Sequence, residues 1–371
     1  MITSISLQNF RSYTKQGFEL GNKTIVVGEN GSGKSNLLEA LYMMATGKSK
    51  RAGVENEMIR YGEQVAVLKG TISKSQETNN IQTELQITLN DGSLSVGRKR
   101  FEVNGVARRM VDFTGKVRMV EFSPEDMEII SGSPSVRRRY LDFVISQTDR
   151  EYHRCVVSYE KGVRARNKIL ERIREGMATH QQLWFWDKLL IKNGEYITAK
   201  REGYISKLNT PLISLPSLGG EGKGGYLAEY DKSVISEVRL AQYETEEVAA
   251  AATLVGPHRD DFVVNMENTS LLHLSPNLGG RVYRDVSRFG SRGEQRMAVL
   301  WLKLGERDFL VQEGELPVLL FDDIFSELDE KHKSEVLKLI NDQTKRGGQV
   351  VMTTADENAI PSSKDWKIIR L

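Results

Sequence analysis

The sequence predicts an α/β protein in which a parallel sheet and additional antiparallel strands form one lobe and helices dominate a second. Three observations predict this fold class. A β-branched run at 24–27 is followed by a glycine-rich loop and then a helical stretch. The apolar runs at 317–321 and 350–354 flank an amphipathic stretch, which is the pattern of a βαβ unit. The long region after about residue 126 has mainly helical periodicity.

The composition is that of an ordinary soluble protein. The 371 residues are 39% apolar and 27% charged, and a net charge of +2 is too small to prove a nucleic-acid partner. The single cysteine, Cys155, leaves no internal disulfide and suits a reducing compartment. Five histidines without a cysteine cluster predict no zinc site. Because no signal peptide and no run of ~20 apolar residues is found, we expect a cytoplasmic protein without a membrane partner.

In chain order, the first elements are short strands at 5–7 and 18–20, joined through a turn-like bend at 9–13 that carries Arg11. The strand at 24–27 follows and leads into the glycine-rich loop. Beyond that loop and its helix, the sequence predicts further strands at 65–72, 83–89, 100–103 and 117–122, with a hairpin turn at 90–92.

The glycine-rich loop at 28–35 fits the phosphate-binding pattern G-x-x-x-x-G-K-[ST]. Glycines let backbone N–H groups face phosphate oxygens, and the helix N-terminus adds partial positive charge. Lys34 would reach the β- and γ-phosphates, and Ser35 would complete a Mg²⁺ shell. The alternative is an accidental Gly/Ser-rich turn, which the flanking strand and helix disfavour. The candidate nucleotide-binding residues here are Gly28, Glu29, Asn30, Gly31, Ser32, Gly33, Lys34, Ser35 and Asn36.

Two long amphipathic helices are predicted at 149–176 and about 181–208, and their short connection favours an antiparallel hairpin. Only Arg166 interrupts the apolar seam of the first helix. The seam is too short to predict a long projecting coiled coil. A glycine-rich loop at 215–225 follows, then a third helix at about 234–252, and then strands at 262–266 and 281–285.

The apolar run at 317–321 ends in two carboxylates, as the strand beside a phosphate-binding loop requires. Asp322 would hold Mg²⁺, and Asp323 would orient or deprotonate the attacking water. The alternative is a buried strand with solubilising acids at its end.

A further segment, Ser291-Arg292-Gly293-Glu294-Gln295, opens a strong helix that extends to Phe309 and offers a second anion site. This segment is followed by the acidic strand and then by S-x-L-D at 326–329. The same order of motifs is found in ABC-type ATPases, which the chain resembles in this region. In that class the serine of one subunit caps the γ-phosphate held by the other. The resemblance places Ser291, Gly293, Gln295 and Asp329 in the nucleotide site.

Along nearly its whole length the chain resembles the bacterial RecF family of recombination-repair ATPases, which belong to the ABC/SMC type. The landmarks that carry this resemblance are Asn9-Phe10-Arg11, GENGSGKSNLLEAL at 28–41, FSPED at 122–126, RRRYLD at 137–142, RNKIL at 166–170, GPHRDDF at 256–262 and SRGEQR at 291–296. The sequence departs from the family pattern at Met297, where threonine is expected, and at Gly305 in the signature helix. Thr353 and Thr354 stand where transporter ATPases carry a switch histidine, and no Q-loop glutamine can be assigned.

The resemblance implies an ABC-type ATPase head with lobe I at 1–123 and 300–371, and a helical lobe II at 124–299. It implies an ATPase that uses ATP and Mg²⁺, with Asp323, Lys34 and Ser291 as catalytic residues and Arg11 among the ATP contacts. It also implies an ATP-dependent homodimer that clamps duplex DNA near junctions of single- and double-stranded DNA. RecR- and RecO-type mediators and the recombinase RecA would be its partners, and slow hydrolysis would reset the clamp.

Candidate DNA contacts are the basic residues Arg137, Arg138 and Arg139, together with Lys161 and Arg164 on the first long helix. Acidic residues interleave with the basic ones, so a solvated helix face stays an equally weighted alternative.

Three rival functions are less consistent with the sequence. A transporter ATPase subunit would leave the helical insertion and the RecF-like landmarks unexplained. A P-loop kinase or GTPase would leave the signature segment without a role, and the guanine-reading NKxD motif is missing. An OLD-type nuclease would need a nuclease domain, for which the chain ends too soon after the ATPase strands.

Overall fold

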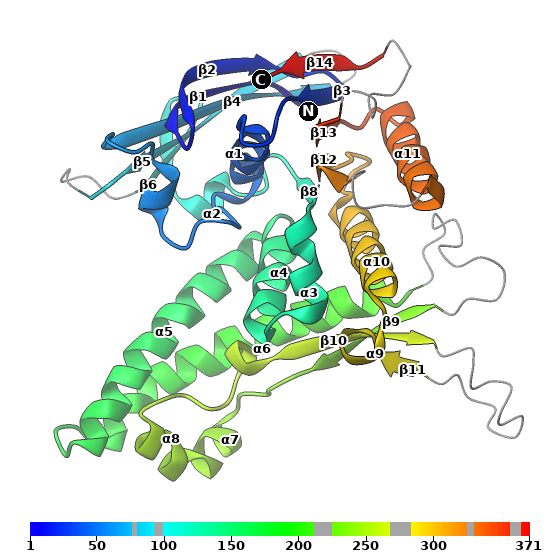
Figure 1. Cartoon of the computed structure of the whole chain (residues 1–371). Coiled ribbons are helices and arrows are strands. Elements are labelled where there is room, and N and C mark those ends of the chain that lie inside the picture. The colour runs from blue at the N-terminus through cyan, green and yellow to red at the C-terminus, as the bar shows by residue number, and fades with distance from the viewer. Residues whose placement is uncertain (76–79, 93–98, 211–224, 268–282, 325–329, 357–364) are drawn as a thin grey trace, which may run out of the picture. The chain divides into compact units, whose positions relative to one another are not determined.

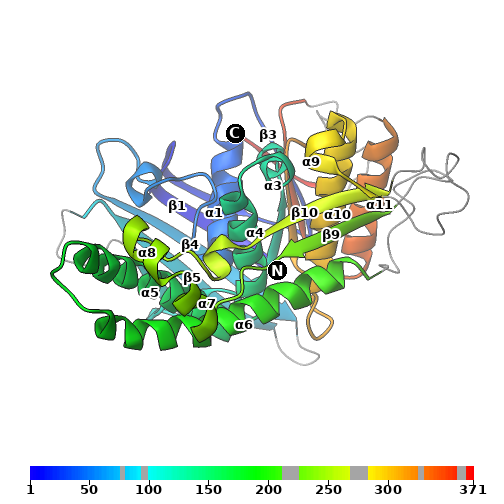
Figure 2. The same ribbon diagram turned by 90° about the horizontal axis from the view of Figure 1, so that it is seen from below.

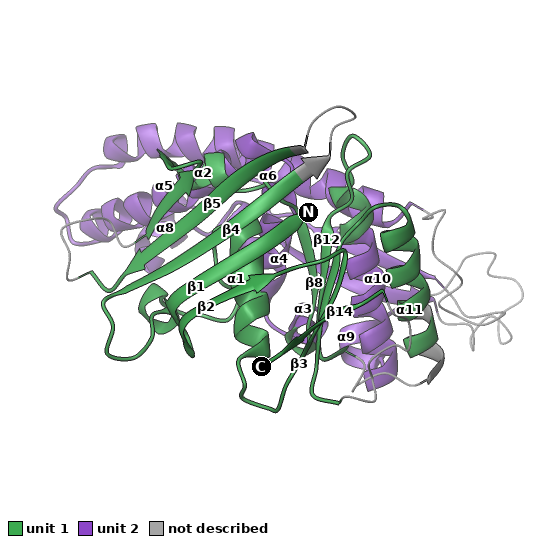
Figure 3. Cartoon of the chain, turned by 90° about the horizontal axis from the view of Figure 1, so that it is seen from above, with its two compact units in different colours: residues 1–125, 306–371 green, residues 126–305 purple. Residues whose placement is uncertain are grey.

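The computed structural model describes residues 1–75, 80–92, 99–210, 225–267, 283–324, 330–356 and 365–371. Its contacts divide the chain into two compact units (Figure 3). Unit 1 comprises Met1–Glu125 and Glu306–Leu371, and unit 2 comprises Asp126–Gly305. Unit 1 thus combines the two ends of the chain, and each unit is described separately below.

Unit 1 contains a five-stranded parallel sheet, and this sheet carries the predicted βαβ unit. Helix α11 (Glu330–Lys345) connects two of its central strands, and every residue of these two strands is buried. Burial on both faces explains why both read as continuous apolar runs. The edge strand β14 (Lys367–Arg370), which pairs with β3 (Lys23–Val27), was not predicted from the sequence. The strand order is β14 (Lys367–Arg370), β3 (Lys23–Val27), β13 (Val350–Thr354), β12 (Val318–Asp322) and β8 (Met119–Phe122).

The second sheet of unit 1 is antiparallel, and its strands extend the short segments predicted from the sequence, except the strand at 106–108, which was not predicted. The connection from β5 to β6 spans 91–98, so the turn predicted at 90–92 is only its beginning; residues 93–98 lie outside the described part of the chain. The sheet order is β2 (Tyr13–Glu19), β1 (Ile2–Phe10), β4 (Val65–Ser75), β5 (Asn80–Asn90), β6 (Lys99–Val103) and β7 (Val106–Arg108). Two short helices complete this part, the 3₁₀-helix Glu55–Met58 and α2 (Met110–Phe113).

Helix α1 (Lys34–Thr46) joins the two sheets of unit 1 into one core (Figure 1). Leu41 of α1 belongs to the same apolar cluster as Leu68 of the antiparallel sheet and Leu320 of the parallel sheet. On β4, Gly70 leaves room for the Met44 side chain, whose Sδ would lie 3.2 Å from an added Cβ. The helix that follows the glycine-rich loop is therefore anchored on both sides.

Unit 2 is mainly helical, and its longest helices form the predicted antiparallel hairpin, which Figure 2 shows side by side. Gly162 of α5 permits close packing, because an added Cβ would lie within 3 Å of the Leu189 and Leu190 side chains of α6. Its α-helices are α3 (Met127–Ser131), α4 (Pro134–Ser146), α5 (Arg150–Arg174), α6 (Trp184–Leu208), α7 (Glu237–Gln242), α8 (Glu244–Ala250), α9 (Val286–Phe289) and α10 (Arg292–Leu310), of which the last turn, from Glu306, belongs to unit 1. A three-stranded antiparallel sheet has the order β11 (Tyr283–Asp285), β10 (Asp261–Glu267) and β9 (Tyr226–Asp231), of which β9 was not predicted.

The structure corrects two expectations in unit 2. The predicted third helix is two short helices, because the backbone of Tyr243 (φ −102°, ψ 10°) ends α7 and begins α8. Arg166 does not interrupt the packing of α5, because its buried guanidinium lies 2.7 Å from Asp187 and 2.6 Å from Glu247. The glycine-rich loop predicted at 215–225 lies outside the described residues except for Gly225.

Candidate functional site

The glycine-rich loop joins β3 to α1 in the strand–loop–helix arrangement predicted from the sequence. Gly31 and Gly33 have φ angles of 85° and 106°, which L-residues with a Cβ rarely adopt. The Lys34 ammonium points back into the loop and donates to the carbonyl oxygens of Gly28 at 2.7 Å and Glu29 at 2.9 Å. The buried Ser32 hydroxyl has no hydrogen-bond partner among the described residues. An inward lysine and an unsatisfied hydroxyl fit a site for phosphate oxygens.

The tip of the β1–β2 hairpin supports this loop from the antiparallel sheet. The Tyr13 hydroxyl donates to the Gly33 carbonyl oxygen at 3.0 Å, and burial raises the pKa of Tyr13 to about 12, so the hydroxyl stays a donor. The Asn36 amide donates to the Ser12 hydroxyl at 3.0 Å. A Cβ at position 33 would lie 3.0 Å from both Ser12 Oγ and the Tyr13 hydroxyl, so only glycine fits here.

Arg11, a predicted ATP contact, lies next to this hairpin tip. Its guanidinium forms a bidentate ion pair with Glu39 of α1, at 2.7 and 2.8 Å, and donates to the Glu57 carbonyl oxygen at 2.7 Å. The arginine side chain keeps 21% of its surface exposed. Its orientation is therefore fixed while part of the side chain stays accessible to solvent.

The predicted metal ligands Ser35 and Asp322 lie together. The Ser35 hydroxyl donates to Asp322 Oδ1 at 3.1 Å. A hydroxyl and a single carboxylate suit Mg²⁺, which takes its other ligands from water and phosphate oxygens. Among the described residues, no group of three or more His, Cys, Asp or Glu side chains could hold a metal.

Thr353 connects the Asp322 carboxylate to the backbone of Asp323 at the end of β12, a role that sequence reasoning missed. The register of β12 and β13 pairs Asp322 with Thr353. The threonine hydroxyl donates to Asp322 Oδ1 at 2.8 Å and accepts from the Asp323 backbone N–H at 3.1 Å. Asp323 has a φ of 47°, the left-handed region. The hydroxyl therefore helps to fix the position from which the Asp323 carboxylate projects.

The predicted signature segment begins α10 of unit 2 with a capping box. The Ser291 N–H donates to Glu294 Oε2 at 2.7 Å, and the Glu294 N–H donates to the Ser291 hydroxyl oxygen at 3.3 Å. Partial burial alone would raise the pKa of Glu294, but the Ser291 hydrogen bonds and the Arg284 charge lower it below its usual value. The Gln295 amide donates to the carbonyl oxygen of Val286 at 3.3 Å. Space around Gly293 is open, and Asp329 lies outside the described residues.

Comparison with known proteins establishes the family. A family model described as the RecF/RecN/SMC N terminal domain matches residues 1–370. A DNA replication and repair protein RecF from Chloroflexus aggregans is 34% identical over 91% of this chain and 90% of that protein. The RecF of Thermomicrobium roseum is 32% identical over 97% of this chain and 94% of that protein. The chain belongs to the RecF family.

A solved structure described as the recombination mediator protein RecF-ATP in the RecFOR pathway matches 97% of this chain and 93% of that one, with 29% identity and a TM-score of 0.82. An Smc head bound to a winged-helix domain of ScpA matches with 17% identity and a TM-score of 0.50, which concerns the fold alone. The predicted fold class, an ABC/SMC-type head without a long coiled coil, is confirmed. No helix among the described residues is long and apolar enough to span a membrane.

Two RecF landmarks that lie far apart in the sequence, RRRYLD at 137–142 and GPHRDDF at 256–262, meet in unit 2. Arg137 forms a bidentate ion pair with Asp261, at 2.6 and 2.8 Å. Arg138 donates to the Asp260 carbonyl oxygen at 2.8 Å. Asp142 accepts from the buried Arg201 of α6 at 2.9 Å. Both landmarks therefore have a structural role.

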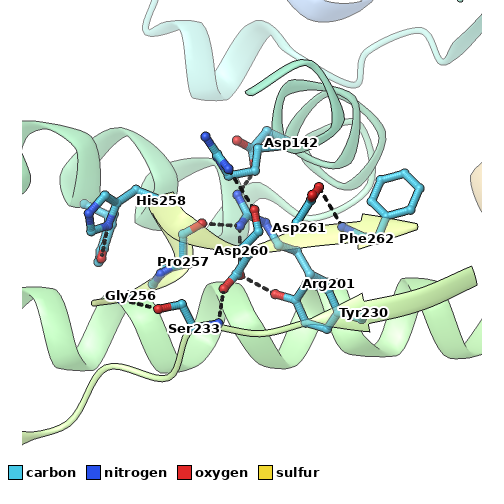
Figure 4. Close-up of polar contacts among 12 residues, drawn as sticks. Asp142, Arg201, Tyr230, Ser233, Gly256, Pro257, His258, Asp260, Asp261 and Phe262 are labelled. Carbon is cyan, nitrogen blue, oxygen red and sulfur yellow. Dashed lines mark hydrogen bonds and ion pairs between the residues drawn. The ribbon is translucent and has the colours of Figure 1, made fainter. Parts of the chain in front are cut away.

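Arg201 is the centre of this network (Figure 4). Its guanidinium contacts Asp260 Oδ2 at 3.0 Å, the Pro257 carbonyl oxygen at 2.7 Å and the Tyr152 hydroxyl at 3.0 Å, besides Asp142. Asp260 is fully buried. It also accepts hydrogen bonds from the Tyr230 hydroxyl and, at 2.7 Å, from the Ser233 backbone N–H. The network links α4, α5, α6, β9 and the segment before β10. These contacts were not predicted from the sequence.

The five predicted DNA contacts fall into two groups. Arg137 and Arg138 are committed to the network above. Arg139, Lys161 and Arg164 are exposed and form no ion pair with another described residue. Contacts inside unit 2 explain why Arg137 and Arg138 are basic. The other three side chains are accessible to a polyanion.

Proposed function

We propose that the chain binds and hydrolyses ATP with Mg²⁺, and that its ATP-bound dimer clamps duplex DNA in recombinational repair and replication. The observation that carries this proposal is the contact between Ser35 and Asp322, with Asp323 adjacent at the end of the same strand. This arrangement puts a phosphate-binding loop, a metal-ligand pair and a candidate catalytic carboxylate at one edge of the parallel sheet. Membership of the RecF family supports it over a transporter ATPase subunit.

In the proposed reaction, the loop N–H groups and Lys34 bind the β- and γ-phosphates. Ser35 and Asp322 would hold Mg²⁺, which supplies positive charge against the phosphate oxygens. Asp323 orients the attacking water and accepts its proton, while Thr353 holds the backbone N–H of Asp323. Arg11, fixed by Glu39, adds positive charge beside the loop.

We also propose that each ATP is shared between two chains. Ser291 immediately precedes a helix of 19 residues and Gly293 lies in its first turn, where the N-terminal N–H groups favour an anion. The capping box fixes the backbone of Ser291, and its hydroxyl uses only an acceptor position toward Glu294. The hydroxyl hydrogen is therefore available to the γ-phosphate held by a partner chain. ATP would then favour the dimer because it supplies contacts to both chains.

For DNA we propose backbone contacts by Arg139, Lys161 and Arg164, without reading of sequence. Lys161 and Arg164 lie three residues apart on α5, so both face the same side of the helix. Duplex DNA near single-strand junctions, RecR- and RecO-type mediators and RecA are the partners that family membership supports. Slow hydrolysis would release the clamp.

The nucleotide proposal is tested by two variants. Lys34→Ala should weaken ATP binding and abolish ATP-dependent dimerisation, because the phosphates lose their main cation. Asp323→Asn should keep ATP binding and accumulate the dimer, because only water activation is lost. ATP titration, sizing with and without ATP, and ATPase rates with and without duplex DNA check these outcomes. Hydrolysis at the normal rate by Asp323→Asn would exclude that carboxylate as the base.

The DNA proposal predicts that Lys161→Gln with Arg164→Gln lowers the slope of log affinity against log salt by about 3.6, since the dimer loses two phosphate contacts from each chain and each contact contributes about 0.9. The change should be the same for unrelated duplex sequences. A control replaces Arg239 of α7, a half-buried arginine outside the proposed surface, with Gln and should leave the slope unchanged. An unaltered slope in the double variant would assign these residues to an ordinary solvated helix face.

A further inference from the structure

The first turn of α6 carries two exposed aromatic rings, at the end of the helical hairpin where α5 ends. Trp184 is 62% exposed and Phe185 is 57% exposed. Tryptophan and phenylalanine are usually well buried, so two adjacent exposed rings are unusual on a surface that covers a core. Both rings belong to unit 2, whereas the glycine-rich loop belongs to unit 1. The nucleotide site therefore gives them no role.

Only basic residues accompany these rings on the exposed part of this stretch. The structure describes every residue from 184 to 194, and the exposed ones are Trp184, Phe185, Lys188 and Lys192. The acidic residue of the stretch, Asp187, accepts from the buried Arg166 at 2.7 Å, so an internal ion pair neutralises its charge. The four exposed residues are called the α6 surface below. This surface combines aromatic rings with positive charge and presents no free carboxylate.

Helical spacing places Trp184, Lys188 and Lys192 along one side of α6. Residues four positions apart are neighbours on a helix and are separated by ~6 Å along its axis. The Lys188 ammonium lies 4.3 Å from the centroid of the Trp184 ring, which is a cation–π contact. Lys192 forms no ion pair with another described residue. A ligand that follows this side of the helix meets a ring first and then two cations.

The α6 surface lies at the same level of the hairpin as two of the proposed duplex contacts. Gly162 of α5 packs against Leu190 of α6, since an added Cβ would lie 2.9 Å from that leucine side chain. Lys161 and Arg164 are within two residues of Gly162, so they are level with Lys188 along the hairpin. A strand that leaves a duplex held by α5 therefore has the α6 surface in the same part of unit 2.

We propose that the α6 surface binds unpaired DNA, with bases stacked on Trp184 and Phe185 and phosphates paired with Lys188 and Lys192. Single-stranded nucleic acid offers aromatic planes and a chain of negative charges together, and rings flanked by cations bind it without reading sequence. The bases of an intact duplex are stacked on each other, so they are not available to these rings. This inference rests on the proposed function, and it gives the clamp a means to distinguish a junction from a plain duplex.

The test measures fluorescence anisotropy of three labelled DNAs with the full chain in the presence of ATP. They are an oligothymidylate, a chain of the same length with abasic sites, and a blunt duplex. Trp184→Ala should weaken oligothymidylate binding by about 5- to 150-fold, the range that corresponds to one stacked base, and leave the other two DNAs unchanged. Trp184→Phe should retain most of the affinity, because a ring remains. Lys188→Gln with Lys192→Gln should weaken both single strands, because both carry the phosphates.

The matched control is Met177→Ala, in the turn before α6. Met177 is apolar and 62% exposed, as Trp184 is, but it has no ring on which a base can stack. Its replacement should leave oligothymidylate binding unchanged. An equal loss in Met177→Ala and Trp184→Ala would contradict stacking and identify a general apolar surface, as a protein partner requires.

Other results would also overturn the inference. Unchanged oligothymidylate affinity in Trp184→Ala would show that no base stacks on that ring. Equal weakening on the abasic chain would show that the substitution disturbs the charges rather than a base contact. A wild-type chain that binds the blunt duplex but not oligothymidylate would refute the α6 surface and leave the proposed duplex clamp standing. Failure to bind any of the three DNAs would refute the proposed function, and the α6 surface with it.

Discussion

Replacement of Arg201 by Met should destabilise unit 2 more than a typical substitution. Methionine retains much of the side-chain volume, so the main loss is the positive charge and its donors. Asp260 would stay fully buried without its cation, and Asp142 would lose the same partner. Breaking a buried ion pair by removal of one member costs about 3–5 kcal/mol, because the remaining charge is desolvated and unpaired. We therefore expect a loss in this range.

A chain with two units need not unfold in one transition, so hydrogen exchange is the better assay than a single melting curve. The amides of β9 and β10 belong to the sheet that Asp260 adjoins. If they exchange through opening of unit 2, a loss of 3–5 kcal/mol accelerates their exchange by roughly 100- to 5000-fold. The strands β12 and β13 of unit 1 provide an internal reference within the same sample.

Arg139→Met on α4 is the matched control, because this arginine is exposed and has no ion pair with another described residue. It should change stability by less than about 0.5 kcal/mol. The triple variant Arg201→Met, Asp142→Asn, Asp260→Asn should be more stable than Arg201→Met alone, because the unpaired charges are removed with the cation. Wild-type exchange in β9 and β10 of Arg201→Met would refute the assignment of Arg201 as the centre of the network.

Three further predictions concern pH, Thr353 and subunit sharing. Burial lowers the pKa of His258 to about 4, below its ordinary value of 6.5. Between pH 6.5 and 4 the unfolded chain therefore binds a proton on this histidine that the folded chain does not bind. The free energy of unfolding falls as the pH drops through this interval, by up to about 3 kcal/mol. Denaturation at several pH values should show a smaller loss over this interval in His258→Gln, and an equal loss would contradict the burial argument. Thr353→Val leaves the Asp323 N–H without its acceptor and should lower the ATPase rate with little change in ATP affinity, whereas Thr353→Ser and Thr354→Val should behave nearly as wild type. Ser291→Ala and Asp323→Ala should each be inactive alone but regain some ATPase activity when mixed, provided that a tagged pull-down confirms the heterodimer; a confirmed heterodimer without activity would count against shared sites.

The sequence by itself determined the nucleotide-binding framework. The loop at 28–35, its flanking strand and helix, and the acidic strand at 317–323 are recognisable because each depends on local chemistry. Glycines at positive φ, an inward lysine and apolar runs on a doubly covered sheet are properties of short segments. The elements of the long helical hairpin are likewise encoded in local periodicity.

Only the tertiary structure decided which distant residues meet. Arg137 reads as a surface cation in sequence, yet it pairs with Asp261, which lies on another element more than a hundred residues away. Arg166 interrupts an apolar seam in sequence, yet Glu247 of α8 neutralises it in the core. Thr353 gains its role from the parallel register that sets it beside Asp322. Local periodicity predicts which face of a helix or strand is buried. Which residues pack against that face depends on the tertiary arrangement of elements far apart in the sequence, so these contacts could not be predicted from the sequence.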